Sequence, residues 1–288
     1  MTFLRSIRDT LSMIRFSHSV FALPFALLSL FLAAGGWPSA QVVVWVLVAM
    51  VAARSAAMGV NRLADRQLDA ANPRTAGREL VTGALSVRFV SLFTLMCVLV
   101  FVLAAWQLNV VALLLSPVVL VVLFGYSFLK RFTVFAHFGV GLALGLSPLG
   151  AWIAVRGADW GDLRIPLVLG AGVLFWVTGF DVIYACQDAD VDRKLGLHSI
   201  PARLGVKRAL QVAALLHVLG IVAFAALAPL AGLGWIYLAA VALAAALLVV
   251  EHAIVSPTDL SRVNAAFFIV NGVVAVILGA AGIVDVLL

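Results

Sequence analysis

The feature that most limits what this chain can fold into is a succession of apolar stretches, each about 20 residues long and almost free of charge. Only 11% of the 288 residues are charged and 65% are hydrophobic, and the mean hydropathy is +1.18. Runs of this length exceed what the core of a water-soluble domain uses. The sequence therefore predicts one all-α membrane domain over residues 1–288.

About nine membrane helices are expected, because a stretch of this length crosses the hydrocarbon core of a bilayer. The boundaries near Asn109 and Pro229 are the least defined, since two spans meet there almost without a loop. Pro117 and Pro148 fall inside spans, where neighbouring helices can satisfy the freed carbonyl groups. The expected ranges are 17–35, 41–64, 88–106, 108–128, 134–155, 165–187, 208–228, 233–253 and 264–286.

Lys and Arg gather at the N-terminus and in alternate loops, those after the second, fourth, sixth and eighth spans. The opposite loops have only Arg156 and Arg164, which Asp159 and Asp162 balance. By the positive-inside rule the basic set faces the cytoplasm, with the N-terminus inside and the C-terminus outside. We expect an integral protein of the cytoplasmic (inner) membrane whose net charge of +6 contacts anionic membrane lipid. No nucleic-acid partner is expected.

The N-terminal segment, with Arg5, Arg8 and Arg15, has no small-residue cleavage site in a suitable place. It is interpreted as an amphipathic start on the cytoplasmic side rather than a removable signal peptide. Cys97 and Cys186 both lie in apolar segments, so we expect packing roles rather than a disulfide.

A polar stripe ends the second span, where residues 61–69 read NRLADRQLD. Asn61, Asp65 and Asp69 are four residues apart, so on a helix they lie within an arc of roughly 80°. Pro73 is expected to stop this helix. The stripe would therefore lie at the cytoplasmic mouth of the span.

A second acidic segment, DVIYACQDADVD over residues 181–192, ends the sixth span. On an uninterrupted helix Asp181, Asp188 and Asp192 fall within roughly 40° of one another, whereas Asp190 points the opposite way. A basic loop follows each acidic segment. This recurrence suggests two related four-helix halves, about 17–128 and 134–253, plus one extra helix.

These carboxylates could be solvated helix ends, but aligned like charges repel by a few tenths of a kcal/mol per pair. An ionised carboxylate as deep as Asp181 costs up to about 3 kcal/mol unless something compensates it. A bound cation is the simpler explanation, and carboxylates favour Mg²⁺, which adds phosphate and water oxygens. A phosphorylated ligand bridged by metal is expected, with Asn61, Asp65, Asp69, Asp181, Asp188 and Asp192 as candidate metal ligands. The scattered histidines show no ligand spacing and are expected to be structural: His18, His137, His198, His217 and His252.

Basic side chains beside both stripes could hold the charged groups of such a ligand, because guanidinium and ammonium groups often bind phosphate. For each of them the alternative is a topology signal that touches no ligand. The candidates are Arg74, Arg78, Lys130, Arg131, Arg193 and Lys194.

Arg54 differs from these because it lies inside the second span, on the face of Asn61 and about 10 Å deeper. A buried guanidinium in a membrane helix is costly, which makes it a candidate functional residue. The alternative is a structural pair with a neighbouring helix.

Together these motifs resemble the UbiA superfamily of intramembrane prenyltransferases. The paired aspartate-rich signature of that family is similar to Asn61-x3-Asp65-x3-Asp69 with Asp181-x2-Tyr184-x3-Asp188-x3-Asp192. The likeness extends to Arg54, to Tyr126-x3-Lys130-Arg131 and to RKLGLHSI after the second motif. It covers most of the chain in order, and both motifs together at span ends are highly specific.

The resemblance implies nine helices around a large central cavity and two Mg²⁺ ions between the motifs and the diphosphate of a polyprenyl donor. It also implies transfer of the prenyl group to an aromatic acceptor. The most similar group by motif wording is the 4-hydroxybenzoate polyprenyltransferases of ubiquinone synthesis. However, IRFSHSVFALPFAL replaces a Lys-Pro element of those enzymes, and NPRTAGREL resembles relatives in menaquinone synthesis through the futalosine route. A dihydroxynaphthoate acceptor therefore stays open.

On this hypothesis the catalytic residues are Asp65, Asp69, Asp181, Asp188, Asp192 and Tyr184. Tyr184 and Tyr126 could stabilise an allylic carbocation, Asp181 or Asp188 could remove the ring proton, and Arg54 could bind an acceptor carboxylate. Transfer to a non-aromatic lipid acceptor such as a glycerol phosphate, or to a haem or chlorophyll precursor, is an alternative. A transporter would need polar residues across the membrane, but spans 2 and 6 are almost wholly apolar beyond Arg54 and Thr178.

Overall fold

The computed structural model describes residues 3–14 and 21–288, and helices dominate this part of the chain. Eight of the described helical segments are long and apolar enough to cross a membrane. The eighth consists of α12 (Val263–Ala265), the π-helical turn η3 (Ala266–Val270) and α13 (Asn271–Leu287). The other seven are built on α3 (Ala40–Ala71), α4 (Val87–Leu108), α5 (Val110–Leu129), α6 (Ala136–Arg156), α7 (Arg164–Ala185), α10 (Val206–Ala231) and α11 (Trp235–Ile254). The predicted all-α membrane fold is confirmed.

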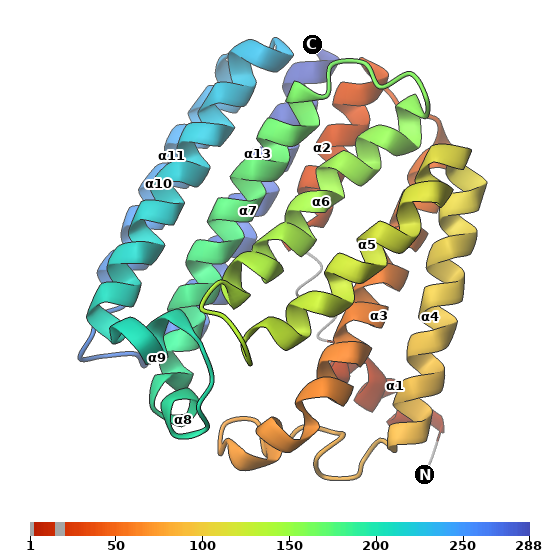
Figure 1. Cartoon of the computed structure of the whole chain (residues 1–288). Helices are drawn as coiled ribbons and strands as arrows, with labels where there is room; N and C mark the ends of the chain where they lie inside the picture. Colours follow the sequence, from red (N-terminus) through yellow and green to blue (C-terminus); the bar gives the residue numbers. More distant parts are fainter. Residues whose placement is uncertain (1–2, 15–20) are drawn as a thin grey trace.

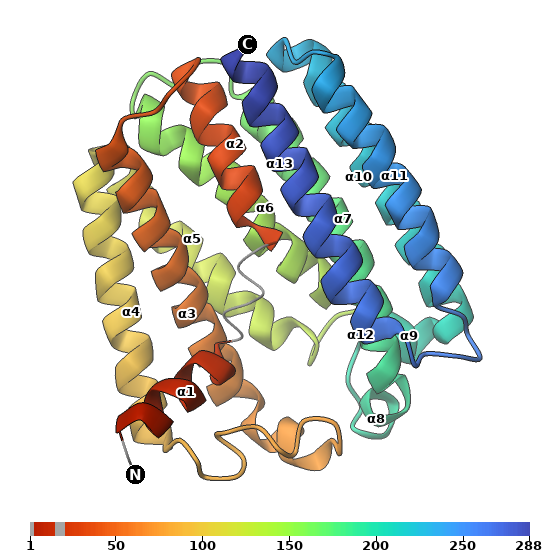
Figure 2. The ribbon, with the colours of Figure 1, turned by 180° about the vertical axis from the view of Figure 1, so that it is seen from behind.

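The expected first span, residues 17–35, begins outside the described residues. Its described part is α2 (Leu23–Ala34), whose 12 residues extend only about 18 Å, less than the hydrocarbon core of a bilayer. The remaining short helices are α1 (Phe3–Met13), α8 (Ala189–Lys194) and α9 (Ile200–Leu204). Figure 2 shows α1 lying obliquely across the ends of α3 and α4.

Short polar and glycine signals set the helix ends. Asn109 separates α4 from α5 with extended backbone, and its side chain accepts a hydrogen bond from the Ala112 N–H at 2.9 Å. The short junction expected near Pro229 is present, but α10 continues through that proline to Ala231, three residues beyond the expected end. Gly232, with φ of 67°, then supplies the left-handed turn that ends the helix.

Close backbone contacts hold the middle of the bundle together. A Cβ added to Gly145 on α6 would stand 2.7 Å from the carbonyl oxygen of Gly170 on α7. A Cβ on Gly141, one turn away, would meet the Thr178 hydroxyl at 2.2 Å. Small residues at such spacing let membrane helices approach closely. As a result, α6 and α7 are held face to face.

An aromatic core joins α2 to the other side of the bundle. Phe25 of α2 stacks on Phe224 of α10 with ring centroids 5.3 Å apart. Trp176 of α7 is fully buried beside them. Such rings bury large apolar areas and fix the relative positions of the helices.

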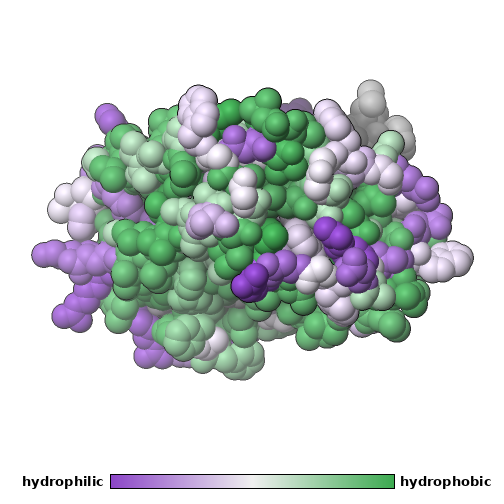
Figure 3. Space-filling view, turned by 90° about the horizontal axis from the view of Figure 1, so that it is seen from above, coloured by the Kyte–Doolittle hydropathy of each residue, from purple (hydrophilic) through white to green (hydrophobic). Residues whose placement is uncertain are grey.

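The outer surface is apolar around the long helices, as expected of side chains that face lipid. Leu99, Val121 and Val222 are 54%, 72% and 59% exposed. The view from one end in Figure 3 shows mainly hydrophobic side chains with small separate hydrophilic groups. At the opposite end, the loop after α3 lies together with α8 and α9 (Figure 1). We call this the motif end. The two related halves and the cytoplasmic orientation stay predictions.

Replacing Gly145 by Ala should destabilise the protein, because the new Cβ meets backbone that cannot rotate away. We expect a cost of about 1–3 kcal/mol, typical of overpacking, measured as a lower midpoint of thermal unfolding in detergent. Gly150→Ala on the same helix is the matched control, since that position is exposed and its Cβ would meet nothing within 4 Å. Equal midpoints for both variants would contradict the close contact of α6 and α7.

Candidate active site

The first acidic stripe lies on the last turns of α3, where the helix continues to Ala71 and ends before Pro73 as predicted. Asp65 and Asp69 are buried, at 2% and 5% exposure. The Asn61 amide donates to Asp65 at 3.2 Å. Buried carboxylates of this kind persist only when they are hydrogen-bonded or paired with cations. The stripe is therefore part of the protein interior at the motif end, not a solvated helix end.

The second acidic segment is not the uninterrupted helix that its spacing suggested. After α7 ends at Ala185, one 3₁₀ turn, η2 (Cys186–Asp188), precedes α8. A 3₁₀ turn advances each residue by about 120° instead of 100°, so the three residues of η2 add about 60° in all and widen the predicted arc to roughly 80°. The three carboxylates are therefore less closely aligned than an uninterrupted helix would make them. Asp190 does point outward as predicted, with its side chain 85% exposed.

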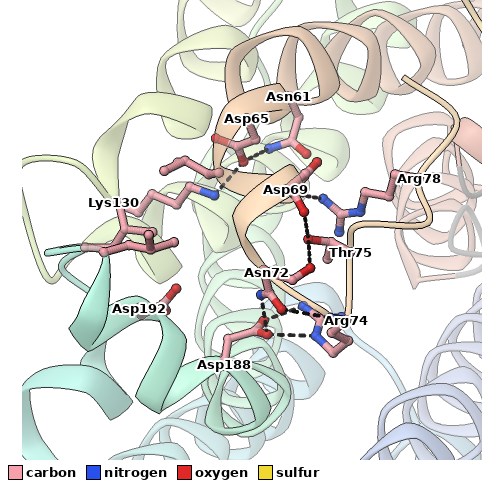
Figure 4. Close-up of a pocket in the computed structure, with 13 residues that line it drawn as sticks. Asn61, Asp65, Asp69, Asn72, Arg74, Thr75, Arg78, Lys130, Asp188 and Asp192 are labelled. Atoms are coloured by element: carbon pink, nitrogen blue, oxygen red, sulfur yellow. Dashed lines mark hydrogen bonds and ion pairs between the residues drawn. The ribbon is translucent and has the colours of Figure 1, made fainter. Parts of the chain in front are cut away.

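Four carboxylates from the two motifs line one pocket of about 190 Å³ at the motif end (Figure 4). Asp65 and Asp69 face it from α3, and Asp188 and Asp192 face it from η2 and α8. Two distant segments thus share one polar cavity. The remaining lining residues are Asn61, Leu68, Asn72, Arg74, Thr75, Arg78, Lys130, Leu195 and Leu197.

Each buried carboxylate of the first motif is paired with a cation. The Lys130 ammonium donates to Asp65 at 2.5 Å, and the Arg131 guanidinium donates to the same carboxylate at 3.1 Å. Arg78 donates to Asp69 at 2.6 Å. These pairs offset the cost of burying charge, which otherwise amounts to several kcal/mol per ion.

Arg74 connects the loop after α3 to the second motif. Its guanidinium makes a bidentate contact with Asp188, through Nε at 2.8 Å and through Nη2, and Nη1 donates to the Tyr184 hydroxyl at 3.0 Å. The Asn72 amide donates to the same carboxylate at 2.9 Å. Burial alone would lower the pKa of Arg74, but the hydrogen bond and charge of Asp188 outweigh it and raise that pKa. The guanidinium therefore stays charged.

A second group of predicted residues lies outside the pocket lining. Arg54 is half-buried on α3 and close enough to Tyr126 of α5 for the two side chains to interact electrostatically. Asp181 lies within electrostatic range of Tyr126 as well, and its carboxylate is 2.7 Å from the Nδ1 atom of His137 on α6. These side chains lie deeper than the first stripe.

Two predicted ligand contacts, Arg193 and Lys194, are exposed and do not line the pocket. Arg193 instead binds the outward-facing Asp190 at 3.1 Å. The charge pattern alone could not separate them from Arg74 and Arg78. Their exposed position in the last turn of α8, outside the pocket lining, decides the difference.

Sequence reasoning missed several polar residues. Asn72 was read only as part of the loop, but it bridges to Asp188. The Thr75 hydroxyl donates to the backbone carbonyl of Asp69 at 3.0 Å and so fixes the turn that carries both arginines. His137 was expected to be merely structural, yet it binds Asp181. For Asn72, the Asn72-Pro73 pair was a turn signal that the sequence already offered.

Comparison with known proteins agrees with this arrangement. Residues 22–272 match the UbiA prenyltransferase family, which covers most of the chain. The chain belongs to this family. The predicted family and enzyme class are thereby confirmed, and the central cavity implied by the resemblance stays a prediction.

Curated relatives of this UbiA-family chain include 4-hydroxybenzoate octaprenyltransferases. The protein of Salmonella paratyphi B is 34% identical over 234 residues, 79% of this chain and 77% of the relative. The protein of Photobacterium profundum is 34% identical over 181 residues, 62% of this chain and 61% of the relative. The alignment thus spans less than two thirds of the latter protein.

Solved structures share the fold of the UbiA-family chain. The apo structure of a UbiA homolog from Aeropyrum pernix K1 has a TM-score of 0.84 at 36% identity and covers 94% of this chain and 98% of that one. A UbiA homolog from Archaeoglobus fulgidus bound to DMAPP and Mg²⁺ has a TM-score of 0.64 at 19% identity, with coverages of 94% and 99%. At that lower identity the likeness concerns the fold alone.

The pocket of the UbiA-family chain fits a hard divalent cation by the chemistry of its donors. The candidate metal ligands in its lining offer amide and carboxylate oxygens, and no His or Cys lines it. Among the described residues no group of three or more acidic, His or Cys side chains converges closely enough to enclose a metal alone. Mg²⁺ does not need such a cage, because it commonly takes one or two carboxylates and completes its shell with phosphate and water.

Cysteines placed at positions 72 and 188 should be joined by a short bifunctional thiol reagent, because the native side chains are 2.9 Å apart. The background would be Cys97→Ser with Cys186→Ala, since both native cysteines are free. Mass spectrometry of the digested protein would identify the joined peptides. A pair at positions 72 and 207 is the control and should stay unjoined, because Lys207 lies in the first turn of α10 and does not line the pocket. Equal yields from both pairs would contradict the shared pocket.

Proposed function

We propose that this protein transfers a polyprenyl group from a polyprenyl diphosphate to an aromatic acceptor, with Mg²⁺, in quinone synthesis. The observation that carries the proposal is the single pocket in which carboxylates of both aspartate motifs meet Arg74, Arg78 and Lys130. Relatives named 4-hydroxybenzoate octaprenyltransferase support the aromatic acceptor. Homologs solved with DMAPP or GPP and Mg²⁺ support the donor and the metal.

The charge balance of the pocket explains why metal and diphosphate would bind together. Its lining includes four carboxylates and three cationic side chains, one negative charge in excess. A diphosphate alone would be repelled by that excess, and a divalent cation alone would compete with the native ion pairs. Asn61, Asp65, Asp69, Asp188 and Asp192 would hold the metal. When bound, Mg²⁺ supplies positive charge that stabilises the leaving diphosphate.

The basic side chains then exchange partners. Arg74, Arg78 and Lys130, now bound to carboxylates, would move to the diphosphate oxygens as the acidic groups turn to the metal. Once they contact the diphosphate, these cations would stabilise its developing negative charge effectively, because the dielectric of the site is low. The allylic C–O bond breaks, and its electron pair leaves with the diphosphate oxygen. The remaining positive carbon would face the rings of Tyr184 and Tyr126.

The aromatic acceptor would lie deeper, beside Arg54 and Tyr126. A π-electron pair of its ring forms the new C–C bond to the allylic carbon, and the ring then loses the proton from the same position. We assign that proton to Asp181, because Asp188 lines the pocket and would hold the metal, whereas Asp181 lies within electrostatic range of Tyr126. Arg54 would bind an acceptor carboxylate by charge-assisted hydrogen bonds.

The membrane setting suits the donor. A long isoprenoid tail is apolar, so it can stay in the acyl phase while its diphosphate reaches the pocket at the motif end. The Lys and Arg bias supports placing that end on the cytoplasmic side of the inner membrane. The charge bias of the loops also supports contact with anionic membrane lipid.

The acceptor is best identified by direct assay. Purified protein with geranyl diphosphate, Mg²⁺ and separate acceptors would be analysed for prenylated products by mass. The panel should contain 4-hydroxybenzoate, a dihydroxynaphthoate and a glycerol phosphate lipid. Product from an aromatic acid supports the proposal. Product only from the glycerol phosphate lipid, or none at all, would refute it.

Asp188→Ala should lower turnover at least about 100-fold, because it removes a metal ligand and frees Arg74 from its partner. The readout is the rate of diphosphate release in the same assay. Asp190→Ala is the matched control two residues away. That side chain is 85% exposed and does not line the pocket, so turnover should stay within about twofold. Similar losses in both variants would argue against the metal assignment.

Arg54→Gln should raise the KM for a carboxylated acceptor about 10- to 100-fold, the equivalent of one charge-assisted hydrogen bond. The KM for geranyl diphosphate should change little, since Arg54 does not line the diphosphate pocket. Arg66→Gln, an exposed position on the same helix, is the control. If Arg54→Gln instead raises the KM for geranyl diphosphate, Arg54 acts on the donor and its assignment to the acceptor is refuted.

A further inference from the structure

His137 on α6 and Asp181 on α7 form a contact that the reaction outlined above does not explain. The Nδ1 atom of His137 is 2.7 Å from Oδ2 of Asp181. The His137 side chain is only 7% exposed, whereas that of Asp181 is 25% exposed. The carboxylate therefore still reaches open space while the imidazole behind it is enclosed.

The other ring nitrogen determines where the imidazole proton sits. The backbone N–H of Ile200 donates to Nε2 of His137 at 3.4 Å. A backbone N–H can only donate, so Nε2 must accept, and the ring proton of a neutral imidazole is then on Nδ1. That proton points at Asp181. His137 thus donates to the carboxylate and has no second proton to pass on.

The helices that hold these two residues cannot easily move apart. Gly145 and Gly170 bring the backbones of α6 and α7 into direct contact. A Cβ on Gly139, close to His137 on α6, would lie 2.9 Å from the Cβ of Tyr126. Asp181 lies within electrostatic range of Tyr126 as well, so the carboxylate that His137 contacts lies between closely packed helices.

The segment 197–200, which we call the strap, connects this pair to the pocket. The His198 N–H donates to the Lys130 carbonyl at 2.7 Å. Ser199 is a hydrogen-bond partner of Asp192, and Ile200 binds His137. Three consecutive strap residues thus contact the end of α5, the second motif and α6.

We propose that His137 is a positioning residue for Asp181. Its hydrogen bond orients the carboxylate toward the acceptor ring, and its contact with Ile200 couples that orientation to the position of the strap. This rests on the proposed prenyl transfer. After the C–C bond forms, the ring carbon carries a strongly acidic proton, so a weak base suffices and its placement decides the rate. The proton goes to the Asp181 carboxylate and from there to water, while the His137 proton stays on Nδ1.

The variants His137→Gln and His137→Phe separate positioning from packing. Glutamine keeps an amide donor for Asp181 and an acceptor for Ile200, whereas phenylalanine keeps only the ring shape. With an aromatic acceptor we expect His137→Phe to lower kcat about 10- to 100-fold, as loss of an orienting partner does elsewhere. His137→Gln should recover most of that rate. The KM for geranyl diphosphate should stay near its original value in both variants.

The fate of the prenyl group gives a readout that a purely structural role would not change. When diphosphate is released and the acceptor is not prenylated, water captures the allylic carbon, loses a proton, and the geranyl group appears as geraniol. We expect this fraction to rise in His137→Phe and to return in His137→Gln. An unchanged fraction, or a rise in the donor KM that matches the fall in kcat, would overturn the proposal.

Histidine tautomers in the unaltered protein provide a test that needs neither activity nor a folded Phe variant. Spectra of ¹⁵N-labelled histidine distinguish the two tautomers, and the signal lost in His137→Gln identifies His137. Protonation on Nδ1 is expected, and protonation on Nε2 would overturn the proposal. Absence of any prenylated product from the unaltered protein would instead refute the proposed function, whatever the tautomer.

Discussion

Charge neutralisation inside a membrane bundle is the constraint on which this structure depends. Asp65, Asp69 and Asp188 are buried or nearly so, and ionised carboxylates there would be costly without partners. The loop after α3 supplies two of those partners, and one of them, Arg74, reaches across to the second motif. Ion pairing therefore does more than offset desolvation. It joins segments more than one hundred residues apart in sequence into one pocket.

Helix contacts beneath the pocket give those pairs a fixed frame. The glycines of α6 and α7 allow backbone contact, and the aromatic core anchors α2, α7 and α10. Above these closely packed elements, the strap contacts Lys130, Asp192 and His137.

Much of the fold followed from sequence because bilayer thickness sets helix length, and most of the span limits expected there lie within a few residues of those observed. The residues of the pocket could be predicted less completely from the sequence. Spacing placed Asp65 and Asp69 correctly on one face, but it could not foresee the 3₁₀ turn that separates Asp181 from Asp188. Likewise, Arg74 and Arg193 have similar sequence surroundings, each next to an acidic motif. Only the tertiary contacts distinguish the one that lines the pocket from the one at the surface.

The pairing of every first-motif carboxylate with an internal cation has one more consequence. A domain whose acidic residues rely on a metal for neutralisation unfolds when a chelator removes the ion. Here the protein's own lysine and arginines already fill that structural need. The stability of the folded bundle is thus separable from the binding of a metal ion. On the proposed function, scarcity of magnesium in a cell would leave a folded but inactive protein whose activity returns with the ion.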